Sequence, residues 1–138
     1  MTVPESLPPK DGSHPVGVYQ VTVEAVFPAS HQLRLYDGSL EPLHVHQWRV
    51  QASLAGATLD AMGVLIDFVR VERVLDDVLA GFRDRHLNDL PCFQGGNPST
   101  ENLARCLFES LRDRLEAPEL LQKVTVWETS RFAAAYAG

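Results

Sequence analysis

The stretch HVHQWRVQASLAG, from His44 to Gly56, decides the fold class of this chain. Side chains at positions i and i+2 of a strand point to the same face of a sheet. With that spacing, one face carries two imidazoles followed by an apolar row, and the other face is polar. The first face consists of His44, His46, Trp48, Val50, Ala52 and Leu54. We therefore predict a strand that packs one face into a core and carries two histidines at its start.

An earlier stretch, VGVYQVTVEAVF, alternates in the same way over residues 16–27. β-Branched and aromatic residues on one face are typical of a strand. Pro28 is expected to end this strand, because proline has no backbone N–H to donate. Asp37 and Gly38 form a turn signal further along the chain. The two stretches therefore predict a pair of antiparallel strands joined by a long loop.

Two helices are predicted after the strand pair. The segment GVLIDF, Gly63–Phe68, leads into the first helix, and Asp67 is its expected N-cap. Asn97 is the expected N-cap of the second helix, with Pro98 at the first helical position. Apolar residues follow each start at helical spacing. They are Phe68, Val71, Leu75, Val78, Leu79 and Phe82 in the first helix, and Leu103, Leu107, Leu111 and Leu115 in the second.

The remaining strands are predicted near the end of the chain. LLQKVTVWET, over residues 120–129, predicts a third strand, and RFAAAYAG, over residues 131–138, a short fourth. Grouped strands with paired helices are typical of an α+β fold. We predict an antiparallel four-stranded sheet with two helices packed on one face, in the order β-β-α-α-β-β. Residues 16–138 would form this single domain, after a flexible N-terminal tail over residues 1–15.

The composition argues against several classes of protein. The 138 residues carry a net charge of −6, which gives no electrostatic reason to expect nucleic acid or a membrane as a partner. The sequence has no apolar run of about 18 residues and no apolar signal segment, so we expect a cytoplasmic protein. Cys92 and Cys106 do not make a disulfide framework, and we expect Cys106 in the core and Cys92 in a loop.

His44 and His46 have two interpretations. They are either two ligands of a metal ion or two ordinary polar residues of a strand. His31 follows the end of the first predicted strand, which places a third imidazole near the start of the second. Three histidines and an open position are typical of catalytic zinc. A zinc site of His31, His44 and His46 is therefore a geometrically reasonable hypothesis.

Six short motifs follow one another along the chain. They are Phe27-Pro28-Ala29-Ser30-His31, His44-Val45-His46, Gly63–Phe68, Leu87-Asn88-Asp89, Asn97–Ala104 and Val126-Trp127-Glu128-Thr129. Their order and spacing resemble the family of 6-pyruvoyltetrahydropterin and 6-carboxytetrahydropterin synthases. The resemblance covers nearly the whole chain after the tail and implies the family's tunnelling fold.

The resemblance also implies a cofactor, a substrate and an assembly. His31, His44 and His46 would bind Zn2+. Glu128 would accept hydrogen bonds from the N–H groups of a pterin ring, and the adjacent Thr129 would also belong to the substrate-binding site. Without the resemblance, Glu128 would be interpreted as a solvent-exposed charge at the end of a strand. The active unit would be a homo-oligomer, a trimer or a hexamer, with its sites between subunits.

The chain departs from the family where the family has its catalytic cysteine. Leu40 occupies that position and is neither a base nor a nucleophile. The adjacent phrase Glu41-Pro42-Leu43-His44 is similar to E-x-L-H in a subgroup of the family, for which the implied reaction leaves a 6-hydroxymethyl product. Glu41 is therefore either a general base with a pKa raised by burial or a loop carboxylate in water.

A second departure concerns the family's aspartate–histidine pair, which aligns with Arg83 and Asp84. Asp84 and the nearby His86 are the candidates for acid–base catalysis, and Arg83 is a candidate contact for a phosphate or carboxylate of the substrate. Val45 also replaces a glycine, which a strand tolerates because β-branched residues suit its backbone.

Three functions remain open on the sequence alone. The first is a zinc-dependent lyase acting on the side chain of 7,8-dihydroneopterin triphosphate or a related pterin. The second is a non-catalytic paralogue that binds a pterin or purine, and the third is an unrelated zinc hydrolase. The product and its pathway stay open too, with deazaguanine (queuosine), biopterin and folate biosynthesis as the alternatives.

Overall fold

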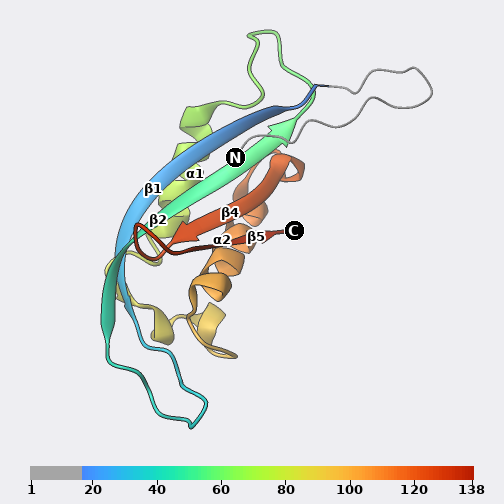
Figure 1. Cartoon of the computed structure of the whole chain (residues 1–138). Coiled ribbons are helices and arrows are strands. Elements are labelled where there is room, and N and C mark those ends of the chain that lie inside the picture. Colours follow the sequence, from blue (N-terminus) through green and yellow to red (C-terminus); the bar gives the residue numbers. More distant parts are fainter. Residues whose placement is uncertain (1–16) are drawn as a thin grey trace, which may run out of the picture.

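The computed structural model describes residues 17–138 as a curved sheet covered on one face by two helices (Figure 1). The strands are β1 (Tyr19–His31), β2 (His44–Gly56), β3 (Arg85–His86), β4 (Leu121–Trp127) and β5 (Ala133–Ala137). The helices are α1 (Phe68–Leu79) and α2 (Thr100–Arg114), with 3-10 turns η1 (Leu87–Asp89), η2 (Pro91–Phe93) and η3 (Pro118–Leu120). The α+β class is confirmed, while the predicted tail over residues 1–15 lies outside the described residues.

The sheet differs from the prediction in strand number and direction. It has five strands in the order β3-β1-β2-β4-β5, so the prediction of four antiparallel strands was wrong. The extra strand, β3, pairs in parallel with β1 at Ala29 and Ser30, and the element order becomes β-β-α-β-α-β-β. A strand of two residues has no periodicity to detect. The predicted short fourth strand is present as β5.

Pro28 lies inside β1 and does not end it. Its carbonyl accepts a hydrogen bond from the Asp84 N–H, on the side of β1 that faces away from β2. The N and the C=O of one strand residue point to the same side, so the missing N–H of Pro28 removes no bond from the β1–β2 ladder. The strand therefore continues to His31, which pairs with His44 at the start of β2.

Side-chain caps define where the two helices begin. The Asp67 carboxylate accepts the Val69 N–H, as predicted for the start of α1. The cap of α2 is Ser99, whose hydroxyl accepts the Asn102 N–H, so the prediction that Asn97 caps this helix was wrong. The amide of Asn97 instead binds the loop between β1 and β2.

The core lies between the helices and the face of the sheet that the alternation predicted. Trp48 is fully buried, and its indole N–H donates to the carbonyl of Ala29. Phe68 is the exception among the predicted core positions of α1, because 61% of it is exposed. The core residues of the two helices are Val71, Leu75, Val78, Leu79, Leu103, Ala104, Leu107, Phe108 and Leu111.

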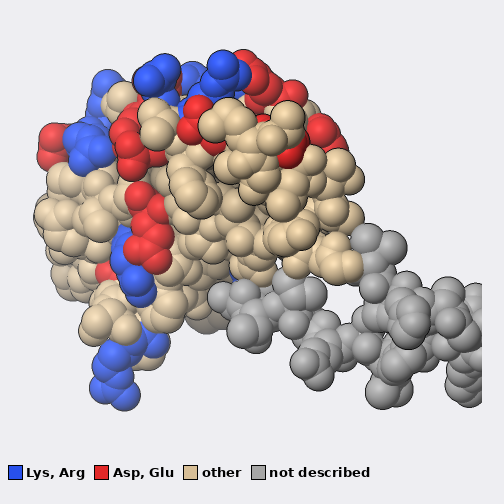
Figure 2. All heavy atoms as spheres, turned by 90° about the horizontal axis from the view of Figure 1, so that it is seen from above, with Lys and Arg blue, Asp and Glu red and all other residues tan. Residues whose placement is uncertain are grey.

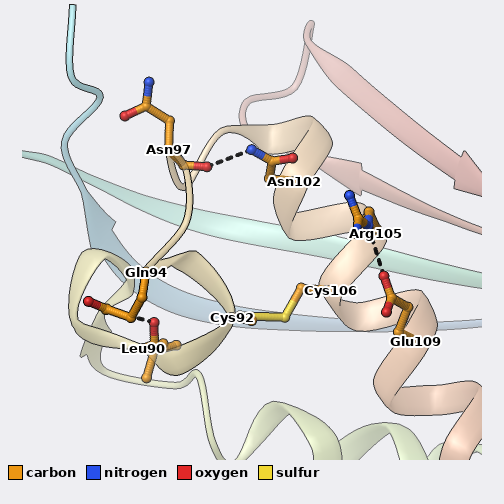
Figure 3. The surroundings of a disulfide bond; sticks show 8 residues. All are labelled: Leu90, Cys92, Gln94, Asn97, Asn102, Arg105, Cys106 and Glu109. Atoms are coloured by element: carbon orange, nitrogen blue, oxygen red, sulfur yellow. Dashed lines mark hydrogen bonds and ion pairs between the residues drawn. A yellow bond between two sulfur atoms is a disulfide. The ribbon is translucent and has the colours of Figure 1, made fainter.

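Cys92 and Cys106 form a disulfide bond (Figure 3). The expectation that the two cysteines form no disulfide was therefore wrong, although each lies where it was expected, Cys92 in a connecting segment and Cys106 against the core. Cys92 belongs to η2 and is exposed, whereas Cys106 belongs to α2 and packs partly against the core. The bond joins the connection before α2 to the second turn of that helix. Sequence spacing alone does not show that two such segments face each other.

The surface carries both signs of charge. On the face drawn in Figure 2, basic and acidic side chains of the described residues are interspersed, and neither sign forms a large separate patch. On this face, the described residues form no basic patch of the kind that is typical of a nucleic-acid-binding surface. Within residues 17–138, neither helix has the length and apolar character that a bilayer crossing requires.

Candidate metal centre

A long loop joins β1 to β2 at one end of the strand pair (Figure 1), and three imidazoles meet at that end. The register places His31 opposite His44 and Ala29 opposite His46. Directly opposed residues of antiparallel strands share a face. The ring centroids are separated by 5.2 Å for His31 and His46, 6.0 Å for His31 and His44, and 5.8 Å for His44 and His46. Strand pairing thus brings the three predicted histidines together.

His31 is the buried member of this cluster, with only 2% of it exposed. Its Nδ1 lies 2.8 Å from the carbonyl oxygen of Pro98. A carbonyl only accepts hydrogen bonds, so Nδ1 carries a proton and, in the neutral ring, Nε2 has a free lone pair. Among the described residues, this buried Nε2 makes no hydrogen bond, although a carboxylate oxygen of Glu128 lies 3.2 Å away. A buried nitrogen of this kind is suited to binding a metal ion.

Glu128 follows β4 and reaches the same point. Its Oε1 lies 3.2 Å from Nε2 of His31 and 3.2 Å from Nε2 of His46. The ligand atoms of these three residues all lie within 4.8 Å of one another. Zinc bonds of about 2.0–2.1 Å in a tetrahedron separate neighbouring ligand atoms by about 3.3 Å. The spacing therefore fits a divalent cation.

The environment of His46 favours the form of imidazole that binds metals. Burial lowers the pKa of His46, and the neighbouring rings of His31 and His44 lower it further, against the raising effect of the Glu128 and Glu41 carboxylates. A lowered pKa favours the neutral ring. Neutral imidazole is the form that coordinates zinc.

Glu41 lies at the edge of the histidine cluster. Its Oε1 accepts the backbone N–H of Leu33 at 3.0 Å, and its Oε2 lies 3.8 Å from Nε2 of His44. The side chain is 22% exposed, so it is neither in bulk water nor sealed from it. The preceding Leu40 is 48% exposed. The structure therefore places the predicted carboxylate beside the His44 ring.

The other predicted catalytic residues are not part of this cluster. Asp84 is exposed and has a backbone φ of 60°, and Arg83 donates to the carbonyl of Val26 at 3.2 Å. His86 is hydrogen-bonded through Nδ1 to the hydroxyl of Ser30 at 2.9 Å. Ser30 precedes His31 on β1 and therefore points to the opposite face of the sheet. Within one chain, Arg83, Asp84 and His86 lie on the other side of β1 from the imidazoles.

The hydroxyl of Thr129, a predicted substrate-binding residue, is hydrogen-bonded within the turn that follows β4. It accepts the backbone N–H groups of Arg131 and Phe132, each at 3.2 Å. The Glu128 N–H donates to the Phe132 carbonyl at 3.0 Å. These bonds close the turn between β4 and β5 and fix the backbone from which the Glu128 carboxylate projects.

Sequence reasoning missed two asparagines that support the site. The Asn88 side chain accepts the N–H of Gln32 at 2.9 Å and donates to its carbonyl at 2.7 Å. Asn97 binds both backbone groups of Arg34 in the same way, at 2.7 and 3.0 Å. Together they hold the chain directly after His31. Both asparagines belong to motifs that the sequence analysis quoted, so their presence was visible but their partners were not.

Comparison with known proteins identifies the family of this chain. The family model of 6-pyruvoyl tetrahydropterin synthase matches residues 20–138. The chain belongs to the 6-pyruvoyl tetrahydropterin synthase family. Members of this family act on pterins, so the family relationship supports an enzyme of pterin side-chain chemistry.

Individual relatives are similar to this chain in sequence or in fold. The chain is 27% identical over 113 residues to a dihydroneopterin monophosphate aldolase of Pyrococcus furiosus, covering 82% of this chain and 92% of the relative. The 6-pyruvoyl tetrahydropterin synthase of Caenorhabditis elegans matches with a TM-score of 0.81 and 24% identity, over 89% of this chain and 97% of that one. A Plasmodium vivax synthase in which a catalytic glutamate is replaced by alanine has a TM-score of 0.71 and 19% identity, over 87% and 97%. The two structures show the likeness of fold.

Proposed function

We propose that the chain is a zinc-dependent lyase that shortens the side chain of a phosphorylated 7,8-dihydroneopterin and leaves 6-hydroxymethyl-7,8-dihydropterin. The observation that carries this proposal is the position of Glu41, 3.8 Å from Nε2 of His44 at the edge of the histidine cluster. A carboxylate there is placed to take a proton from a substrate hydroxyl beside the imidazoles.

One relative supports a side-chain cleavage, and another supports a glutamate as a catalytic residue. The Pyrococcus furiosus relative is named an aldolase of dihydroneopterin monophosphate, and it matches over most of its length. For the Plasmodium vivax synthase, a glutamate is described as a catalytic residue. Leu40 has no thiol that could act as the base. We therefore assign Glu41 as the general base.

We assign the metal to His31, His44 and His46, and the pterin ring to Glu128. Three neutral imidazoles would leave the charge of a zinc ion uncompensated. A zinc ion held by them would polarise the hydroxyls of a substrate side chain and make them more acidic. The ring of His44 is 45% exposed, so it is free to turn from Glu41 toward the other two rings. Glu128 would then present its carboxylate to the N–H groups of the pterin.

The proton transfers follow from the product. Glu41 takes the proton of the hydroxyl on the second side-chain carbon, and the bond between the first and second carbons breaks. The second carbon leaves within an aldehyde, while the electron pair moves from the first carbon into the C=N bond of the dihydropterin ring. A proton returned to the first carbon then gives the hydroxymethyl group.

Asp84, His86 and Arg83 would act in the site of a neighbouring subunit. They lie across β1 from the imidazoles of their own chain, so acid–base catalysis by Asp84 or His86, and a phosphate contact of Arg83, require a homo-oligomer. Exposed apolar residues on the sheet face without helices, Val26 and Val45, support such an assembly. Light scattering of the purified protein is expected to give the mass of a trimer or a hexamer, and a monomer would contradict this assignment.

Product analysis tests the proposed function directly. The zinc-loaded protein is incubated separately with 7,8-dihydroneopterin, its monophosphate and its triphosphate, and the products are identified by mass spectrometry. We expect 6-hydroxymethyl-7,8-dihydropterin and a two-carbon aldehyde from at least one phosphorylated substrate. A 6-pyruvoyl or 6-carboxy product would contradict the carbon–carbon cleavage.

A second candidate function is a non-catalytic pterin-binding protein. It is favoured by Leu40, at the family's cysteine position, and by the exposed Asp84 in place of the family's histidine. Tight pterin binding without any product from these substrates would select it.

A further inference from the structure

The orientation of His31 depends on a segment that lies outside the sheet. Its Nδ1 donates to the carbonyl of Pro98, which belongs to the connection between η2 and α2. This bond selects the tautomer whose Nε2 lone pair faces His46 and Glu128. A displacement of Pro98 would therefore change the direction and the tautomer of a proposed metal ligand without touching the sheet.

The segment that carries Pro98 is closed by the disulfide (Figure 3). Cys92 lies before it and Cys106 lies within α2, after it, so the bond encloses the stretch with Asn97 and Pro98. Inside the enclosed stretch, Gly95 and Gly96 are both exposed, and glycine has the largest conformational freedom of any residue. The cross-link removes conformations that these two glycines would otherwise allow.

Other contacts hold the segment in part. Asn102 donates through its side chain to the carbonyl of Asn97 at 2.8 Å, and Phe93 is buried in the core. Asn97 binds the backbone of Arg34. These contacts do not depend on the disulfide. Its loss should therefore loosen the position of Pro98 without unfolding the chain.

The disulfide is accessible to a reagent in solution. Cys92 is exposed, and both cysteines line a surface hollow of about 540 Å³ together with Asn97, Asn102 and Arg105. A phosphine reductant reaches such a bond, and the two sulfurs then take up two electrons and two protons to become thiols while the phosphine is oxidised with the oxygen of water.

We propose that the Cys92–Cys106 disulfide positions the metal ligand His31 through the carbonyl of Pro98, so that the oxidised chain binds zinc more tightly than the reduced chain. This proposal rests on the proposed zinc site. Removing an outer partner of a metal-bound histidine typically weakens metal binding by about 10- to 100-fold. We expect an effect at the lower end of that range, because Asn97 and Phe93 keep their own contacts.

The test compares zinc affinity in three forms of the full chain. They are the oxidised protein, the phosphine-reduced protein, and the double variant Cys92→Ser with Cys106→Ser, which has no thiol that could itself bind zinc. Competition with a chromophoric chelator at fixed pH gives each dissociation constant. We expect the zinc dissociation constant to rise about 10-fold both in the reduced protein and in the double variant. The phosphine should not change the zinc dissociation constant of the double variant.

A second measurement separates positioning from general stabilisation. Nitrogen-15 NMR of the metal-free protein is expected to show a single tautomer of His31, protonated at Nδ1, in the oxidised chain and a mixture in the double variant. A lower melting temperature with equal zinc affinity and an unchanged tautomer would overturn the proposal. Failure of the oxidised protein to bind zinc would instead overturn the zinc site on which it rests.

Discussion

Replacing His31 by alanine is expected to weaken zinc binding by more than about 100-fold and to abolish turnover. Even the outer partners of metal ligands contribute about 10- to 100-fold to affinity, so loss of a ligand should exceed that range. His31 is also the most buried imidazole of the cluster and the one fixed by Pro98. Metal content by mass spectrometry and affinity by chelator competition measure the effect. His86→Ala, a histidine on the other side of β1, is the control and should keep its zinc.

Two further variants decide which third residue completes the ligand set. If His44 is the third ligand, His44→Ala loses zinc, whereas Glu128→Gln keeps zinc and loses pterin binding. If instead Glu128→Gln loses zinc and His44→Ala keeps it, the ligands are His31, His46 and Glu128. In the structure the Glu128 carboxylate already lies 3.2 Å from Nε2 of both histidines. Circular dichroism of each variant confirms that the fold is retained.

Glu41→Gln is expected to lower kcat by about 10²- to 10⁴-fold, the range typical of a lost general base. Glutamine has nearly the same shape, and its oxygen can still accept the Leu33 N–H, so the loop should keep its position. It has no group that takes up a proton from the substrate. Zinc affinity and the dissociation constant for the pterin should change little, and steady-state kinetics with the substrate identified by product analysis measures kcat.

Glu119→Gln is the matched control for this variant. Glu119 is exposed on η3, which leads into β4 where Leu121 pairs with Leu54 at the end of β2 farthest from His44. Its loss should leave kcat unchanged. Full activity of Glu41→Gln would rule out the proposed general base, and loss of zinc in that variant would assign Glu41 to the metal instead.

The sequence by itself determined the two long strands, their buried faces and the cap of α1. Each of these depends on a pattern that repeats within a few residues, such as the alternation from His46 to Leu54 or the position of Asp67 before an apolar row. The same local rule placed His44 and His46 on one face. Glu41 lies three residues before His44, so the sequence also showed that a carboxylate lies in the loop that leads to the histidines.

Only the tertiary structure decided how the site is assembled. β1 continues through Pro28 because the proline nitrogen, which has no hydrogen to donate, faces away from β2. That side is known only when the pairing of β1 with β2 and β3 is known. The contacts of His31 with Pro98 and Glu128, and the bond between Cys92 and Cys106, join segments far apart in the chain. Such contacts arise from strand register and from the way loops close over the core. No periodicity within a single segment carries that information.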